Sequence, residues 1–133
     1  KFDGFSFRIS KNNQERAHNL FVSWYKKYAL SQIEPMAKSF AQRLGVTYNG
    51  CSVTDTMKYR WASCTPQGNV YFSWRIIKAP VFVIEYLIVH ELAHLRISEH
   101  SLEFWNIVSI QVPSYEDAKI WLRDNGNVLE VDF

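Results

Sequence analysis

Three of the four histidines in this 133-residue chain lie within eleven positions, at His90, His94 and His100. The first two belong to the motif H-E-x-x-H, and a helix brings imidazoles four residues apart to one face, where both can bind one zinc ion. Glu91 is offset by one residue, so it lies beside the ion without binding it. A general base in that place takes a proton from metal-bound water. The motif therefore predicts a hydrolytic site with one Zn²⁺ per chain.

A third ligand is expected from the residues that follow the motif. His100 is the predicted ligand, because it is close in the sequence and imidazole is a preferred zinc ligand. Glu85 is excluded, since it projects from the opposite side of the helix to His90. The carboxylates that remain as alternatives are those of Glu99, Glu103 and Glu116.

A different interpretation of the same residues is a buried helix whose histidines are satisfied by hydrogen bonds. The shortage of histidine elsewhere in the chain favours the metal site over this alternative. A purely structural zinc site is disfavoured, because such sites usually fill four protein ligands and Cys51 and Cys64 are far from the cluster in sequence. Three histidines leave one position for water, which is the catalytic arrangement.

The composition limits the class of protein. A hydrophobic content of 47% and an aromatic content of 16% fit one folded domain over residues 1–133, not a disordered chain. The net charge of +2 does not indicate a nucleic-acid partner. The longest nearly apolar run, residues 79–89, contains Glu85 and is too short to span a bilayer. Two cysteines form no disulfide framework, which predicts reduced, buried thiols in a cytoplasmic protein.

The elements that must position the site follow from periodicity and turn chemistry. Residues 80–95 are apolar almost all round, which is typical of a buried helix. Ser101 is the expected cap of a further helix to about 112, and Ser114 that of a last helix that stops before Gly126. Upstream, the sequence predicts a half-buried strand over 2–9, a helix over 12–28 and a second helix or kinked continuation, capped by Ser31 and running to 44. Gly45 is expected to end this helix by adopting the left-handed backbone conformation.

Between the first helices and the metal helix the sequence predicts β-structure. Residues 46–55 are rich in β-branched side chains, and the runs 57–64 and 69–77 are separated by turn residues, so they are expected to form an antiparallel hairpin. An extended peptide could add to that hairpin as another strand. The predicted fold class is α+β.

Together, the residues around these elements resemble the YgjP-type metallopeptidases, relatives of the SprT-like and WLM zincins. The shared residues are Arg60-Trp61-Ala62-Ser63-Cys64, Gly68-Asn69, Trp74-Arg75, the H-E-L-A-H helix, His100-Ser101, Phe104-Trp105, Pro113, Tyr115 and Trp121-Leu122. The resemblance implies a zincin-like fold, with a small antiparallel sheet beside a central metal helix. It also implies Zn²⁺ ligation by His90, His94 and His100, with Glu91 as the base.

Three differences from related patterns stand out. Ala62 replaces a glycine that is usual in the YgjP-type family, and Ser73 replaces a common asparagine. The histidine spacing also matches the metzincins, but Ile97 stands where they have a turn glycine, which argues against that group.

The predicted activity is zinc-dependent hydrolysis of a peptide or protein substrate, in which zinc-bound water activated by Glu91 attacks a peptide carbonyl. Arg60, Tyr71 and Arg75 are candidate substrate-binding residues that would stabilise the oxyanion. One alternative keeps the metal and hydrolyses a nucleotide phosphoanhydride, with arginines binding the phosphates. Another is a SprT-like protease that acts on DNA-associated proteins. The sequence leaves open the oligomeric state and whatever precedes Lys1.

Overall fold

The computed structural model describes residues 11–54 and 61–129, with side chains over 14–54 and 61–125. The predicted strand over 2–9, the start of the strand from 57 and the last residues of the tail lie outside the described residues. The described elements, in order, are α1 (Lys11–Leu44), β1 (Gly50–Thr54), β2 (Ala62–Cys64), β3 (Asn69–Ser73), the 3-10 helix η2 (Trp74–Lys78), α2 (Val81–Ala93), α3 (Leu102–Gln111) and α4 (Tyr115–Leu129). The fold is α+β, as predicted.

The sheet has the order β1-β3-β2 and is mixed. Strands β2 and β3 are antiparallel, as predicted, and Gly68 closes their turn at a φ of 90°, where its amide donates to the carbonyl of Thr65. Strand β1 instead runs parallel to β3, from the pair Gly50–Asn69 to the pair Thr54–Ser73. The expectation of an antiparallel sheet is therefore wrong for β1, because residue alternation predicts the buried face of a strand but not its direction.

Strand β3 is shorter than predicted, since the expected strand over 69–77 ends at Ser73. The hydroxyl of Ser73 accepts a hydrogen bond from the backbone amide of Arg75, 3.3 Å away, and so caps η2. Trp74 and Ile76 are nevertheless buried. The alternating apolar pattern correctly indicated burial there, but a side-chain cap turned the backbone from strand into helix.

Helix α1 is one continuous helix of 34 residues that passes through Pro35. The predicted cap at Ser31 does not form, because the Ser31 hydroxyl donates to the carbonyl of Tyr28 within the same helix at 2.6 Å. Ile33 and Ala37, on either side of the proline, are fully buried, so packing against the core offsets the amide that Pro35 lacks. Gly45, at a φ of 70°, ends the helix as predicted.

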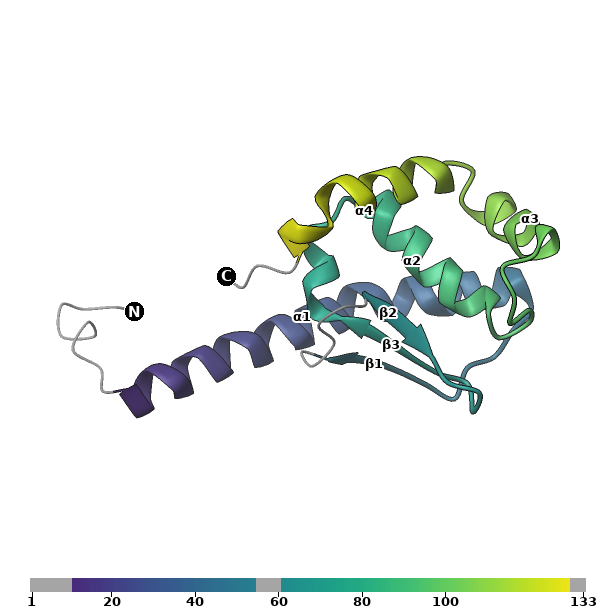
Figure 1. The fold of residues 1–133 in the computed structure, drawn as a ribbon. Helices are drawn as coiled ribbons and strands as arrows, with labels where there is room; N and C mark the ends of the chain where they lie inside the picture. Colours follow the sequence, from purple (N-terminus) through teal and green to yellow (C-terminus); the bar gives the residue numbers. More distant parts are fainter. Residues whose placement is uncertain (1–10, 55–60, 130–133) are drawn as a thin grey trace.

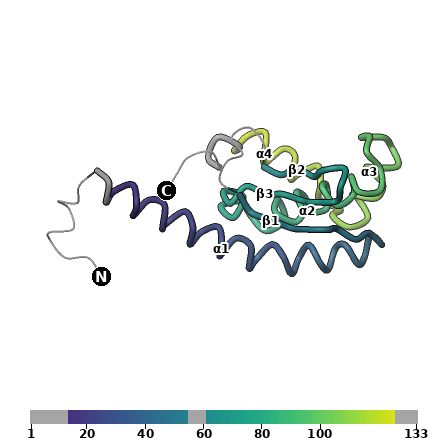
Figure 2. The backbone as a smooth tube through the Cα atoms, turned by 90° about the horizontal axis from the view of Figure 1, so that it is seen from below, coloured from purple at the N-terminus to yellow at the C-terminus, as the bar shows by residue number. Residues whose placement is uncertain are grey.

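Helix α1 lies beside β1, and its N-terminal half extends beyond the sheet (Figures 1 and 2). Four large apolar or aromatic side chains of α1 stay exposed: Leu20, Phe21, Trp24 and Tyr28.

Helix α2 is the centre of the molecule, with β2, α1, α3 and α4 packed around it (Figure 1). Nine of its thirteen residues are buried, which confirms the predicted buried helix, although Pro80 is its N-cap instead of its first residue. Ser101 caps α3 as predicted, with its hydroxyl 3.3 Å from the amide of Phe104. Helix α4 continues through Gly126, so the predicted stop there is wrong. Among the described residues, no helix has the length and apolarity needed to span a bilayer.

Candidate metal centre

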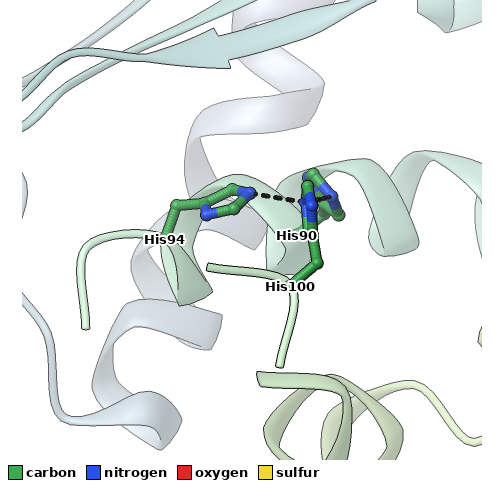
Figure 3. Close-up of side chains that lie close together, drawn as sticks. All are labelled: His90, His94 and His100. Carbon is green, nitrogen blue, oxygen red and sulfur yellow. Dashed lines mark hydrogen bonds between the residues drawn. The ribbon is translucent and has the colours of Figure 1, made fainter. Parts of the chain in front are cut away.

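His90, His94 and His100 converge on one point between α2 and the start of α3 (Figure 3). His90 lies in the last turn of α2 and His94 is its C-cap residue, so both imidazoles leave the same end of the helix. His100 comes from the short connection to α3. Its Nε2 lies 3.2 Å from Nε2 of His90 and 3.0 Å from Nε2 of His94. The structure thus brings together the three histidines that the sequence singled out.

The spacing of these nitrogens fits a zinc ion. With Zn–N bonds of about 2.0–2.1 Å, two ligands of a tetrahedral site lie about 3.3–3.4 Å apart. The two distances from His100, 3.2 and 3.0 Å, are within a few tenths of an ångström of that value. Among the described residues, these three histidines are the group whose ligand atoms could hold an ion together.

Acceptors on the far sides of two rings determine which ring nitrogen carries the proton. Nδ1 of His94 lies 3.2 Å from the carbonyl oxygen of Ile97, and Nδ1 of His90 lies 3.1 Å from Oε2 of Glu91. A carbonyl or a carboxylate can only accept, so each neutral ring carries its proton on Nδ1. Nε2 of both rings is then a lone pair aimed at the common point, which is the tautomer that a zinc ligand needs.

Hydrogen bonds alone do not satisfy this arrangement. If Nε2 of His100 carries a proton, it can donate to His90 or to His94, but not fully to both. The lone pair of the other ring would then lie close to Nε2 of His100 without a proton of its own to accept. A cation at the common point satisfies all three nitrogens, so the donor set fits a metal better than it fits the hydrogen-bonded alternative.

Two aromatic side chains of α3 pack against the imidazoles. Phe104 is fully buried, and its ring centroid lies 5.3 Å from that of His90, 4.6 Å from that of His94 and 5.0 Å from that of His100. Trp105 stacks on His100 at 5.7 Å. Since both aromatic residues belong to the first turn of α3, the cap at Ser101 also determines where His100 lies.

Burial lowers the pKa of His94, followed in size by the effect of the neighbouring His90. A lowered pKa keeps the imidazole neutral, with its lone pair available, to a lower pH than an exposed histidine would allow.

A cavity of about 730 Å³ opens beside the histidines. Its walls come from β2 and the turn that follows it, from α2, from the connection to α3 and from α4. Glu91 lines this cavity although only 7% of its surface is exposed. A buried carboxylate that faces a cavity next to three converging imidazoles can exchange a proton with a molecule bound there.

Two further cavity residues were missed by the sequence reasoning. Cys64, at the end of β2, lies close enough to Glu91 to share a hydrogen bond with it, and Tyr86 lies one helical turn before His90. Burial, then the charge of Glu91, raises the pKa of Tyr86 to about 12. The four-residue spacing from His90 was a usable signal for Tyr86. Nothing in the sequence placed Cys64 beside Glu91, because that contact depends on the packing of β2 against α2.

Two of the predicted substrate-binding residues, Tyr71 and Arg75, are not among the residues that line the cavity. The third, Arg60, lies outside the described residues. Tyr71 pairs with Ser52 and Ser63 in the sheet. Of the alternative ligands, Glu99 and Glu103 are exposed, and Glu116 accepts a hydrogen bond from the hydroxyl of Tyr115 on α4.

The comparisons with known proteins agree with this geometry. The YgjP-like, metallopeptidase domain family matches residues 6–125, which is most of the chain. A crystal structure of the metallopeptidase zymogen abylysin from Pyrococcus abyssi is similar in fold, with a TM-score of 0.56 and 22% sequence identity. The match covers 68% of this chain and 93% of that one. No curated protein matches the chain.

Proposed function

Since the chain belongs to the YgjP-like metallopeptidase family, we propose that it is a zinc-dependent peptidase whose ion is held by His90, His94 and His100. The observation that carries the proposal is the convergence of the three Nε2 atoms. Two of these atoms belong to His90 and His94, whose rings carry their proton on Nδ1. Zinc in such a site supplies a Lewis acid and lowers the pKa of a water beside it to about 7.

Glu91 is the proposed general base. It follows His90 directly, lines the cavity and is shielded from bulk solvent. In peptide hydrolysis its carboxylate takes the proton of the attacking water and then returns it to the leaving amine. His90 donates to one oxygen of that carboxylate through Nδ1, which orients Glu91 relative to the imidazoles.

The substrate is proposed to bind as an extended peptide along β2. This strand is at the edge of the described sheet, and its residues Ala62–Cys64 line the cavity. An edge strand offers backbone groups that a peptide can pair with, and this would place a scissile bond beside Glu91. Arg60, Tyr71 and Arg75 stay predictions as oxyanion donors, although Tyr71 and Arg75 lie away from the cavity.

The alternative substrates receive less support from the cavity. A nucleotide phosphoanhydride needs cations to bind its phosphates, and the described lining residues include no lysine or arginine. Action on DNA-associated proteins would call for a clustered basic surface, and Lys26, Lys27, Lys38 and Arg43 are distributed along α1. A cytoplasmic location stays a prediction from cysteine usage.

The test is Glu91→Gln in zinc-loaded protein, assayed against a quenched fluorescent peptide library and against nucleoside triphosphates. The expected result is peptide cleavage by the wild type, retained zinc in the variant, and a loss of turnover of about 10²–10⁴-fold, the contribution of a general base. Glu85→Gln is the matched control, because Glu85 is on the same helix but does not line the cavity. Full activity in Glu91→Gln, or cleavage of triphosphates alone, would refute the proposal.

A further inference from the structure

Cys64 is the last residue of β2, and its thiol shares the cavity with Glu91 and the three histidines. Strand β2 packs against α2, and Cys64 on the strand and Glu91 on the helix both line the cavity between these elements. The thiol of Cys64 lies within hydrogen-bonding reach of the carboxylate of Glu91, whose charge also acts on it. The other free cysteine, Cys51 on β1, does not line the cavity.

Glu91 needs partners because it is a buried carboxylate. Only 7% of its surface is exposed, and burying an ionised carboxyl without hydrogen bonds is costly. His90 supplies one donor through Nδ1, 3.1 Å from Oε2. The thiol of Cys64, which is within reach on the opposite element, is the candidate for a second donor.

We propose that Cys64 is a positioning residue: its thiol donates a hydrogen bond to the carboxylate of Glu91 and holds that carboxylate toward the cavity next to His90, His94 and His100. This inference rests on the proposed function, because the orientation of Glu91 matters only if Glu91 handles a proton. A second donor restricts the carboxylate to one rotamer, and a misplaced base loses rate steeply with distance.

The thiol keeps its proton in this environment. Burial, then the charge of Glu91 and the hydrogen bond to it, raises the pKa of Cys64 to about 11. A protonated thiol is a donor and a poor nucleophile or metal ligand at neutral pH. Consistent with this, the group of side chains whose ligand atoms converge consists of histidines and does not include Cys64.

The first test compares Cys64→Ala, Cys64→Ser and the control Cys51→Ala in zinc-loaded protein. The substrate is a peptide that the wild type cleaves in the library assay. Cys64→Ala is expected to lower kcat about 10-fold or more, the cost of a misplaced catalytic group. KM and the zinc content should stay as in the wild type. Cys64→Ser should recover most of kcat, because a hydroxyl also donates, and Cys51→Ala should match the wild type. An unchanged kcat in Cys64→Ala, or a loss that Ser does not recover, would overturn the proposal.

A second test does not need activity. In zinc-free protein, the melting temperatures of Cys64→Ala, Glu91→Ala and the double variant form a double-mutant cycle. The two losses should not add, whereas the losses from Cys51→Ala and Glu91→Ala should. Additive losses for Cys64 and Glu91 would show that the two side chains do not interact and would overturn the proposal. If the wild type cleaves no peptide but the cycle shows coupling, the contact stands and the proposed function fails.

Discussion

Nδ1 of His94 donates a hydrogen bond to the carbonyl of Ile97, 3.2 Å away, and this bond ties the end of α2 to the connection that carries His100. The backbone amide of Ile97 in turn donates to Ala93, so the chain turns around the last residues of the helix. No positive φ is needed: the glycines Gly45 and Gly68 are the residues with positive φ in the described part of the chain. An isoleucine therefore fits where the metzincins have a glycine.

Replacing His100 should weaken the metal site selectively. His100→Ala removes one of the three converging Nε2 atoms, and we expect the zinc content of purified protein to fall from about one per chain to a small fraction of it. Elemental analysis after dialysis measures this directly. His18→Ala is the control, because His18 is an exposed residue of α1 and should leave the zinc content unchanged. An unchanged zinc content in His100→Ala would indicate that the third ligand is a carboxylate such as that of Glu99 or Glu103.

Alkylation should report the environment of Cys64. A shift of its pKa from 9.0 to about 11 reduces the thiolate present at pH 8 about 100-fold, and the reaction with iodoacetamide should slow accordingly. Glu91→Gln removes a charge that raises this pKa, so labelling of Cys64 should become faster. Peptide mapping by mass spectrometry separates the two cysteines.

Cys51 provides the matched control for that measurement. Its pKa is also raised to about 11, by burial and then by Glu34. Glu34→Gln should speed labelling of Cys51 and leave Cys64 unchanged, and Glu91→Gln should do the reverse. A variant that accelerates both cysteines equally would indicate general loosening instead of a local charge effect.

The same shifts predict alkaline destabilisation. The folded protein keeps both thiols protonated up to a pH of about 11, whereas the unfolded chain loses these protons from a pH of about 9. The thiol contribution to stability is therefore complete below pH 9 and is lost as the pH rises toward 11. Melting temperatures between pH 8 and 11 should fall less steeply in a variant with both cysteines replaced by alanine.

Phe104→Ala should affect stability and metal binding together. Phe104 is fully buried and contacts all three histidines, and emptying such a site typically costs about 3–5 kcal/mol. Urea unfolding of the zinc-free protein measures the loss, and zinc titration should show weaker binding. Phe21→Ala is the control, because Phe21 is 40% exposed. An equal loss from both substitutions would contradict the assigned role of Phe104.

Ser101→Ala tests the cap that places His100. Loss of the hydrogen bond from the Phe104 amide to the Ser101 hydroxyl should lower the free energy of unfolding by about 1 kcal/mol. Ser109→Ala in the same helix is the comparison, because the Ser109 hydroxyl donates to the carbonyl of Asn106 and caps nothing. If Ser109→Ala were the more damaging substitution, the cap would not be the stabilising contact.

The features that the sequence predicted well depend on local chemistry. Residues four apart on a helix share a face, so the geometry of His90 and His94 follows once α2 is known to be helical. The apolar run after Pro80 implied burial, and the cap at Ser101 depends on a hydrogen bond that spans three residues. Convergence of His100 was also favoured by its short separation from His94.

The features that were wrong depend on contacts between distant elements. Pro35 was expected to break or kink the first helix, but Ile33 and Ala37 bury their side chains in the core and keep it continuous. The direction of β1 and the contact of Cys64 with Glu91 are decided by how elements pack. No local pattern in the sequence encodes them.

The parallel pairing of β1 with β3 has a consequence for the order of folding. Paired residues of β2 and β3, such as Cys64 and Val70, are close in the chain, whereas Cys51 of β1 also pairs with Val70 but is 19 residues away. Closing the longer loop costs more chain entropy, and this cost precedes the stabilising contacts that β1 makes with β3. We therefore expect the hairpin that forms one wall of the cavity to assemble first and β1 to join it last.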